Sequence, residues 1–109
     1  MPATPDQLPN TLTLLILKTL ARGPNHGFGI AVHIQDASQG LLNVEEGSLY
    51  PALHRLERDR LVSAEWKLTA HHRRARYYRL TPAGRKRLSQ AEQHWTSLAK
   101  GVGKLLRFA

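Results

Sequence analysis

Residues 47–60 combine hydrogen-bonding side chains with positive charge in an arrangement that suits contact with DNA. If this segment is a helix, its apolar residues recur at the spacing of a buried stripe. The opposite side then presents a hydroxyl, a phenol, an imidazole and a guanidinium, which hydrogen-bond to base edges and phosphates in a major groove. An ordinary surface helix has the same amphipathic pattern, so this segment alone favours neither interpretation. The predicted buried residues are Leu49, Ala52, Leu53 and Leu56, and the candidate DNA-binding residues are Ser48, Tyr50, Pro51, His54 and Arg55.

The positive charge of the chain is concentrated in and just after this segment. The 109-residue sequence, a length typical of one domain, carries a formal net charge of +8. Residues 54–87 contain eleven Arg and Lys and three acids, a net charge of +8, whereas the rest of the chain holds five bases and five acids. So confined a basic patch attracts a polyanion through phosphate contacts and counterion release. This distribution favours a nucleic-acid partner over a merely cationic surface.

Composition and motifs argue against most other chemistry. The chain has no cysteine, so it can form neither a disulfide nor a thiolate metal site. The apolar run at residues 12–17 is too short to span a bilayer and is a poor signal peptide, so a cytoplasmic protein without membrane contact is expected. No phosphate loop, nucleophile elbow or metalloprotease motif is present. For the pair His71 and His72, in a basic loop, solvation or phosphate contact is favoured over zinc. We therefore expect no enzyme activity, no cofactor and no metal.

The part of the chain before residue 47 predicts two helices. Residues 1–7 are expected to be disordered, and an almost entirely apolar helix is predicted over residues 8–22, ended by Gly23 and Pro24. A second helix is predicted from about residue 26 to 38. No strand is expected before it, so the glycines around its start are interpreted as a turn and a close helix contact. The predicted buried residues of this second helix are Phe28, Ile30, Ala31 and Ile34.

After residue 60 the hydrophobic pattern changes from helical to alternating. Val62, Ala64, Trp66 and Leu68 alternate with polar residues, which predicts a half-buried strand. A second β-rich run at residues 75–80 follows a polar, basic tip, so the two form an antiparallel hairpin. Two helices, a polar-faced third helix and a basic hairpin make a winged helix-turn-helix over residues 8–80, which strengthens the DNA interpretation of the third helix. Arg73 and Arg74 at the tip are expected to contact phosphates.

The last part of the chain, residues 81–109, is predicted to be a C-terminal dimerisation helix. Thr81 and Pro82 are typical of an N-cap and a first helical residue. An apolar seam then recurs at alternating intervals of three and four residues, as in a coiled coil. Packing of this seam on its own domain is the alternative. The fold class expected is mainly α with a small β-hairpin, and the seam comprises Leu88, Ala91, Trp95, Leu98, Val102 and Leu105.

This combination resembles the PadR family of bacterial winged-helix transcriptional regulators. The resemblance is carried by residues 47–57 and 77–81, and it extends over about residues 9–106, where further matches are His26, Gly27, Ile30, Gly84 and Trp95. It implies a homodimer, usually a repressor, that binds an imperfect palindrome near a promoter. The short last helix resembles the smaller subgroup, in which that helix and the first one form the dimer.

The resemblance also implies roles for individual residues. Ser48, Tyr50, Pro51, His54 and Arg55 match the DNA-facing part of the family motif, and Arg73 and Arg74 match its basic wing. Arg60 departs from the pattern, because the family usually has glycine at the end of the third helix. Some small members bind planar aromatic or drug-like ligands between the subunits, near a tryptophan of the last helix. Trp95 matches that position, although its place in the seam favours a packing role over a ligand role.

The leading hypothesis is therefore a homodimeric, sequence-specific transcriptional regulator, a repressor that binds a pseudo-palindromic operator in double-stranded DNA. Two other classes stay open. A nonspecific nucleic-acid-binding architectural protein would bind operator and scrambled duplexes alike. A winged-helix protein-interaction module would use its basic face to dock an acidic partner.

Overall fold

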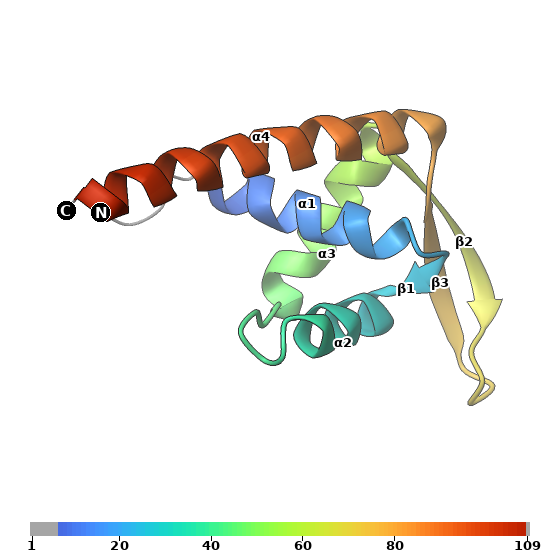
Figure 1. The fold of residues 1–109 in the computed structure, drawn as a ribbon. Helices are drawn as coiled ribbons and strands as arrows, with labels where there is room; N and C mark the ends of the chain where they lie inside the picture. Colours follow the sequence, from blue (N-terminus) through green and yellow to red (C-terminus); the bar gives the residue numbers. More distant parts are fainter. Residues whose placement is uncertain (1–6, 109) are drawn as a thin grey trace.

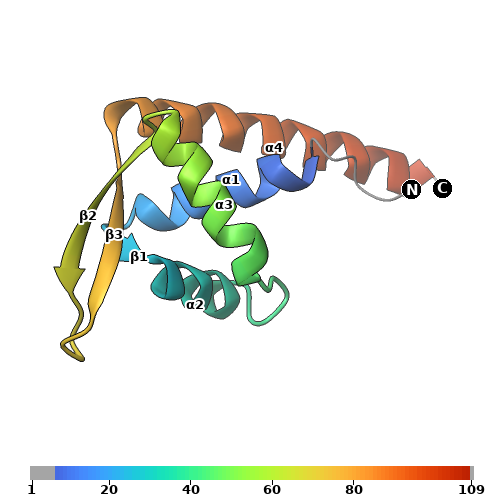
Figure 2. The same cartoon turned by 180° about the vertical axis from the view of Figure 1, so that it is seen from behind.

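Helix α1 occupies the middle of the fold in the computed structural model, which describes the chain path over residues 7–108 and the side chains over residues 11–107 (Figure 1). Helix α4 packs along one side of α1, α2 lies on the opposite side, and α3 crosses from α2 towards the start of α4 (Figures 1 and 2). The elements are α1 (Gln7–Leu20), β1 (Asn25–His26), α2 (Gly27–Ala37), α3 (Glu46–Arg58), β2 (Val62–Leu68), β3 (Arg74–Leu80) and α4 (Pro82–Phe108).

The central position of α1 explains why its sequence is apolar on almost every side. It contacts α2, α3, α4 and β3, so its side chains are covered from several directions. Burial of these residues removes apolar surface from water and supplies the main stabilising force. Of the segment predicted to be disordered, residues 1–6 lie outside the described residues, and Gln7 already belongs to α1. The buried core includes Ile16, Leu17, Leu20, Ile30, Ile34, Leu49, Leu53, Leu56, Val62 and Tyr78.

A three-stranded antiparallel sheet closes one end of this core. Its order is β1-β3-β2, with His26 paired to Tyr77 in β1 and β3, and Val62 paired to Leu80 in β2 and β3. The predicted hairpin is confirmed, but the expectation of no strand before the second helix was wrong. A two-residue strand is too short to produce an alternating pattern, and β1 exists because the free edge of β3 offers it partners.

The outer half of the hairpin extends beyond the helices (Figures 1 and 2). Val62 is buried and Ala64 is half-buried, but Trp66 is 59% exposed and Leu68 is 65% exposed. The prediction that all four alternating residues form a half-buried face was therefore wrong for Trp66 and Leu68. The alternation continues along a strand that is longer than the core beneath it, and sequence periodicity alone does not reveal where that core ends.

The start of α2 also differs from expectation at one residue. Phe28 was predicted to be buried, but it is 70% exposed. His26 is the N-cap, and its Nδ1 accepts a hydrogen bond of 3.1 Å from the N–H of Gly29, which turns Phe28 outward beside the His26 ring. The close helix contact expected at the glycines is confirmed, because a Cβ on Gly27 would lie 2.7 Å from the ring of Tyr50 in α3.

Helix α3 ends in a turn closed by backbone hydrogen bonds. The N–H of Leu61 donates to the carbonyl of Leu56 at 2.9 Å, and the N–H of Arg60 donates to the carbonyl of Glu57 at 3.0 Å. This is the Schellman arrangement, whose residue after the C-cap adopts a left-handed conformation. Arg60 occupies that position with φ of 61°, so an arginine stands where glycine is sterically favoured.

The same turn anchors the start of α4. The Thr81 hydroxyl donates to the carbonyl of Arg60 at 2.7 Å and accepts from the N–H of Gly84 at 3.0 Å, so Thr81 is the N-cap that the sequence predicted. A Cβ on Gly84 would lie only 2.0 Å from the carbonyl oxygen of Leu61. Glycine at this position therefore lets the first turn of α4 approach the end of α3 closely.

Candidate nucleic-acid interface

The two sides of α3 differ in the way the sequence predicted. Leu49, Ala52, Leu53 and Leu56 are buried in the core. Tyr50 is 39% exposed, and it packs partly against α2 near Gly27. Pro51 is the sixth residue of the helix and cannot donate to the carbonyl of Gly47, so the helix forgoes one internal hydrogen bond. All five candidate DNA-binding residues are exposed, namely Ser48, Tyr50, Pro51, His54 and Arg55.

Charge is distributed unevenly along α3. Its N-cap is Glu45, whose side chain makes no capping hydrogen bond, and Glu46 follows in the first turn. The last turn carries Arg55 and Arg58. Carboxylates stabilise the positive end of the helix dipole but repel phosphate. Phosphate contact is therefore most favourable at the C-terminal half of α3 and at the wing, which is the hairpin of β2 and β3.

Some of the basic residues are already engaged within the protein. Arg76 of β3 forms an ion pair of 2.5 Å with Glu57 of α3, and both side chains are about one-third exposed. This pair joins strand β3 of the wing to α3, so Arg76 has a structural role. Burial raises the pKa of Tyr78 above its ordinary value, and the nearby charge of Arg76 opposes that rise.

The tip of the wing is a compact turn that presents arginine. The N–H of Thr69 donates to the carbonyl of Arg73 at 2.8 Å, and the N–H groups of His71 and Arg73 both donate to the Thr69 hydroxyl at 3.3 Å. Arg73 and Arg74 are exposed. Within the described residues, neither they nor Arg55 has a carboxylate within ion-pair distance. These guanidinium groups are free to meet an external anion.

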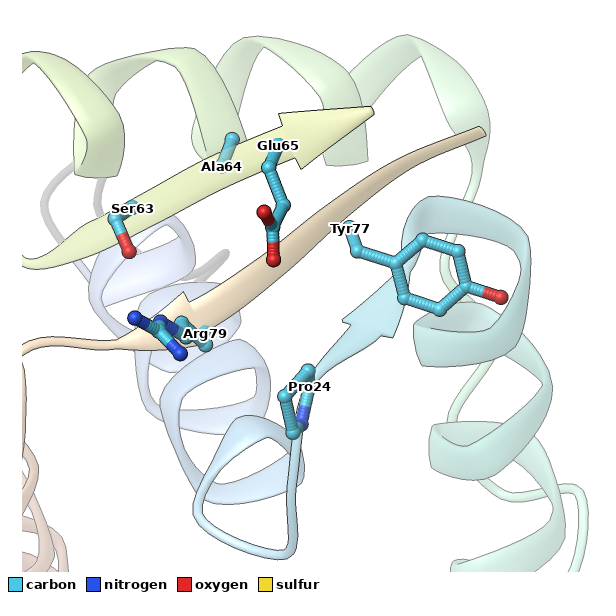
Figure 3. Close-up of a pocket in the computed structure, with 6 residues that line it drawn as sticks. All are labelled: Pro24, Ser63, Ala64, Glu65, Tyr77 and Arg79. Atoms are coloured by element: carbon cyan, nitrogen blue, oxygen red, sulfur yellow. The ribbon is translucent and has the colours of Figure 1, made fainter. Parts of the chain in front are cut away.

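The sheet face turned away from the core is mixed in charge. A hollow of about 180 Å³ lies on this face. Figure 3 shows the residues that line it, namely Pro24, Ser63, Ala64, Glu65, Tyr77 and Arg79. Glu65 also pairs with Lys67 at 3.2 Å. A carboxylate in this position disfavours phosphate, so this face is a weaker candidate for DNA contact than the side of the wing that faces α3.

The apolar seam of α4 divides into two parts. Leu88 is buried and Ala91 is half-buried against the domain, near the ion pair of 3.2 Å between Lys18 of α1 and Glu92 of α4. Beyond that point α4 extends past the start of α1 (Figure 1). The remaining seam residues are exposed, with Trp95 at 48% and Leu105 at 71%, and with Leu98 and Val102 between them.

Comparison with known proteins identifies the family of this fold. Residues 16–90, from the middle of α1 into α4, match the Transcriptional regulator PadR-like family. The chain belongs to this PadR-like family. Its PadR relatives are transcriptional regulators, not enzymes, and DNA binding is implied by that family.

Individual relatives agree with this assignment. Transcriptional regulator Rv3488 of Mycobacterium tuberculosis is 38% identical to the PadR-like chain over 89 residues, which cover 82% of this chain and 79% of the relative. A PadR-family regulator from Eggerthella lenta is 35% identical, with a TM-score of 0.76, over 92% of this chain and 86% of that chain. A transcriptional regulator from Clostridium thermocellum gives a TM-score of 0.81 at 28% identity, over 91% of this chain and 96% of that chain. These structures share the winged-helix fold.

Two further properties bear on what the PadR-like chain can bind. Between residues 7 and 108, no helix is both long enough and apolar enough to cross a membrane. In the same described part, no three His, Cys, Asp or Glu side chains gather where they could hold a metal ion.

Sequence reasoning missed the exposed aromatic rings of Phe28 and Trp66. Their exposure depends on which element lies beside them, so no pattern in the sequence indicated it.

Proposed function

We propose that this PadR-like regulator is a cytoplasmic homodimeric repressor that binds a pseudo-palindromic operator in double-stranded DNA. One observation carries the proposal: the polar side chains of α3 and the wing-tip arginines Arg73 and Arg74 are exposed, and neither these two nor Arg55 has a carboxylate partner in the described part of the chain. Ser48 and Tyr50 would position α3 and contact bases, and Arg55 would contact a base or a phosphate. Pro51 and His54 complete the groove-facing surface, and Arg73 and Arg74 would bind phosphates on the flanking backbone.

The exposed seam of α4 supports the homodimer. Trp95, Leu98, Val102 and Leu105 present apolar surface that gains stability when it is covered. A second copy offers the same stripe, and two-fold pairing of identical stripes forms a closed assembly. In such a dimer, two α3 helices would enter successive major grooves about 34 Å apart, which explains the palindromic character expected of the operator. Leu88 and Ala91 would mainly support α4 on its own domain.

A small aromatic effector at the dimer interface is a further part of the proposal. Trp95 is half-exposed on the α4 seam, where a planar ligand between two subunits could stack on its indole ring. Packing against the partner's seam uses the same surface. The two roles separate experimentally, because a packing residue stabilises the dimer whether or not a ligand is present.

Direct binding measurements test the function. The purified protein is titrated with a duplex from its own upstream promoter region and with a scrambled duplex, across a series of salt concentrations. We expect saturable binding of two subunits to the promoter duplex and a much weaker, more salt-sensitive affinity for the scrambled one. Equal affinity for both would favour a nonspecific architectural protein. Absence of binding to either at low salt would favour a protein-interaction module.

A further inference from the structure

Trp66 is a large apolar side chain on the wing, and the core of the domain does not cover it. More than half of its surface is exposed, and Leu68 beside it is similarly uncovered. Exposure of an indole to water is unfavourable compared with its burial, and aromatic rings of this kind are enriched where proteins contact partners. The wing therefore presents an apolar platform in the middle of an otherwise basic element.

The strand register shows which way this platform faces. Trp66 pairs with Arg76 and Leu68 pairs with Arg74 across the antiparallel ladder, so these four side chains share one face of the hairpin. Arg76 on this face forms its ion pair with Glu57 of α3. The indole consequently lies on the side of the wing that is turned towards α3, rather than on the mixed-charge face shown in Figure 3.

The charges around Trp66 restrict what can cover it. The Arg74 guanidinium carbon lies 5.3 Å from the centre of the Trp66 ring, within the range of a cation–π contact. Residues 66–80 contain five Arg and Lys and no acid. An acidic protein surface would pair with the cations but would not cover the indole. An uncharged apolar protein surface would cover the indole but would not pair with the cations. A nucleic acid satisfies both parts, because its phosphates meet the cations and its sugars and bases present apolar faces.

We infer that Trp66 contacts DNA directly and positions Arg74 for the same contact. The indole packs on a deoxyribose or base edge beside the groove that α3 occupies, and its ring holds the Arg74 guanidinium in line with the neighbouring minor groove. A narrow minor groove has enhanced negative potential, which suits an arginine presented in this way. This inference rests on the proposed function, and it adds a residue that acts by apolar contact rather than by charge.

Intrinsic fluorescence gives a direct test, because the chain has two tryptophans, Trp66 and Trp95. Wild-type protein and the Trp66→Phe variant are each titrated with a duplex of at least two helical turns at low salt. We expect saturable quenching in the wild type and loss of most of it in Trp66→Phe, which keeps an aromatic ring and should still bind. Equal quenching in both proteins would overturn the inference, since the signal would then come from Trp95.

Affinity measurements separate an apolar contact from a charged one. Trp66→Ala should weaken duplex binding about tenfold. It should reduce the dependence of affinity on salt by less than Arg74→Ala does, because it removes no cation and only releases Arg74 from the ring that positions it. Combining Trp66→Ala with Arg74→Ala should cost less than the product of the two single losses, since the first change already removes the platform of Arg74. The matched control is Arg73, which has the same charge but no ring contact with Trp66. In the double variant Trp66→Ala/Arg73→Ala, the two losses of affinity should multiply.

The outcomes distinguish this inference from the proposed function. If the wild type binds duplex DNA but Trp66→Ala binds equally well, only the role of Trp66 fails. If the wild type does not bind duplex DNA at all, the proposed function fails as well. A change in the sedimentation of Trp66→Ala without DNA would assign the platform to contact between copies of this chain, which would also overturn the inference.

Discussion

Ser48, Tyr50 and Arg55 face solvent because Leu49 and Leu53, on the other side of α3, are held in the core. Helical periodicity is sufficient to predict such a division, and the sequence predicted it correctly for every residue of the α3 motif. Contacts between elements that are distant in the sequence cannot be predicted from periodicity. No periodicity indicates that Arg76 is engaged by Glu57 while Arg73 and Arg74 are not, because that depends on how the hairpin packs on α3.

Removal of the wing-tip charges should weaken binding to all DNA sequences. In the double variant Arg73→Ala/Arg74→Ala, each subunit of the proposed dimer loses two phosphate contacts, so the slope of log affinity against log salt should fall by about 4 in magnitude. The measurement is fluorescence anisotropy with promoter and scrambled duplexes over a salt series. Lys100→Ala/Lys104→Ala removes the same charge from exposed positions of α4 and serves as the control. An unchanged slope in the wing variant would place the wing outside the interface.

The hydroxyl of Tyr50 should affect recognition more than folding. Its ring packs near Gly27, so Tyr50→Ala would also disturb the contact between α2 and α3. Tyr50→Phe keeps the ring and removes only the hydroxyl. We expect it to weaken promoter binding several-fold, with little change in scrambled-duplex affinity or in thermal unfolding. Equal losses for both duplexes would make Tyr50 a residue that supports the surface without reading sequence.

The elements that hold this surface are joined at the turn between α3 and β2. Thr81 connects the end of α3 to the start of α4, because it caps α4 and its hydroxyl also donates to the carbonyl of Arg60. The N-cap of α4 could be predicted because Thr81 and Pro82 are local signals. Strand β1, the outward position of Phe28 and the exposed end of β2 could not be predicted, because each depends on which element lies beside it rather than on its own pattern.

Arg60→Gly should stabilise the fold. The left-handed conformation at this position costs a residue with a Cβ about 1 kcal/mol relative to glycine. We expect the free energy of unfolding in urea to rise by about that amount. Arg60→Ala removes the same charge but keeps the Cβ, so it should give no such gain. Equal stabilisation by both variants would attribute the effect to relief of charge repulsion instead of backbone conformation.

The molecule as a whole is extended by α4 and the wing. Its principal extents are 54 × 29 × 23 Å, and its radius of gyration is 15.2 Å, compared with about 13 Å for a compact domain of this length. The C-terminal half of α4 therefore presents its apolar seam beyond the domain. The sequence predicted the seam and its length, but the point at which it leaves its own domain, after Ala91, required the packing of α1 against α4.

A charge placed in this seam should disrupt the proposed dimer. Leu98→Glu introduces a carboxylate that would have to be buried without a partner, so the variant should sediment as a monomer at concentrations where the wild type is a dimer. Ser97→Glu, one residue away and exposed on another side of α4, should remain dimeric. Analytical ultracentrifugation measures both. A wild-type monomer, or a dimeric Leu98→Glu variant, would contradict assembly through the seam.

The most direct test of a dimer that reads DNA through α3 is a hydroxyl-radical and methylation-interference footprint on the promoter duplex that the protein binds. The expected result is two symmetric sets of backbone positions protected from hydroxyl radicals, and two matching sets of guanines whose major-groove methylation prevents binding, centred about 34 Å apart along one side of the duplex. His54→Ala should weaken both sets together, because each subunit contributes the same residue. A single protected set, or uniform protection without phase, would contradict paired α3 helices in successive major grooves.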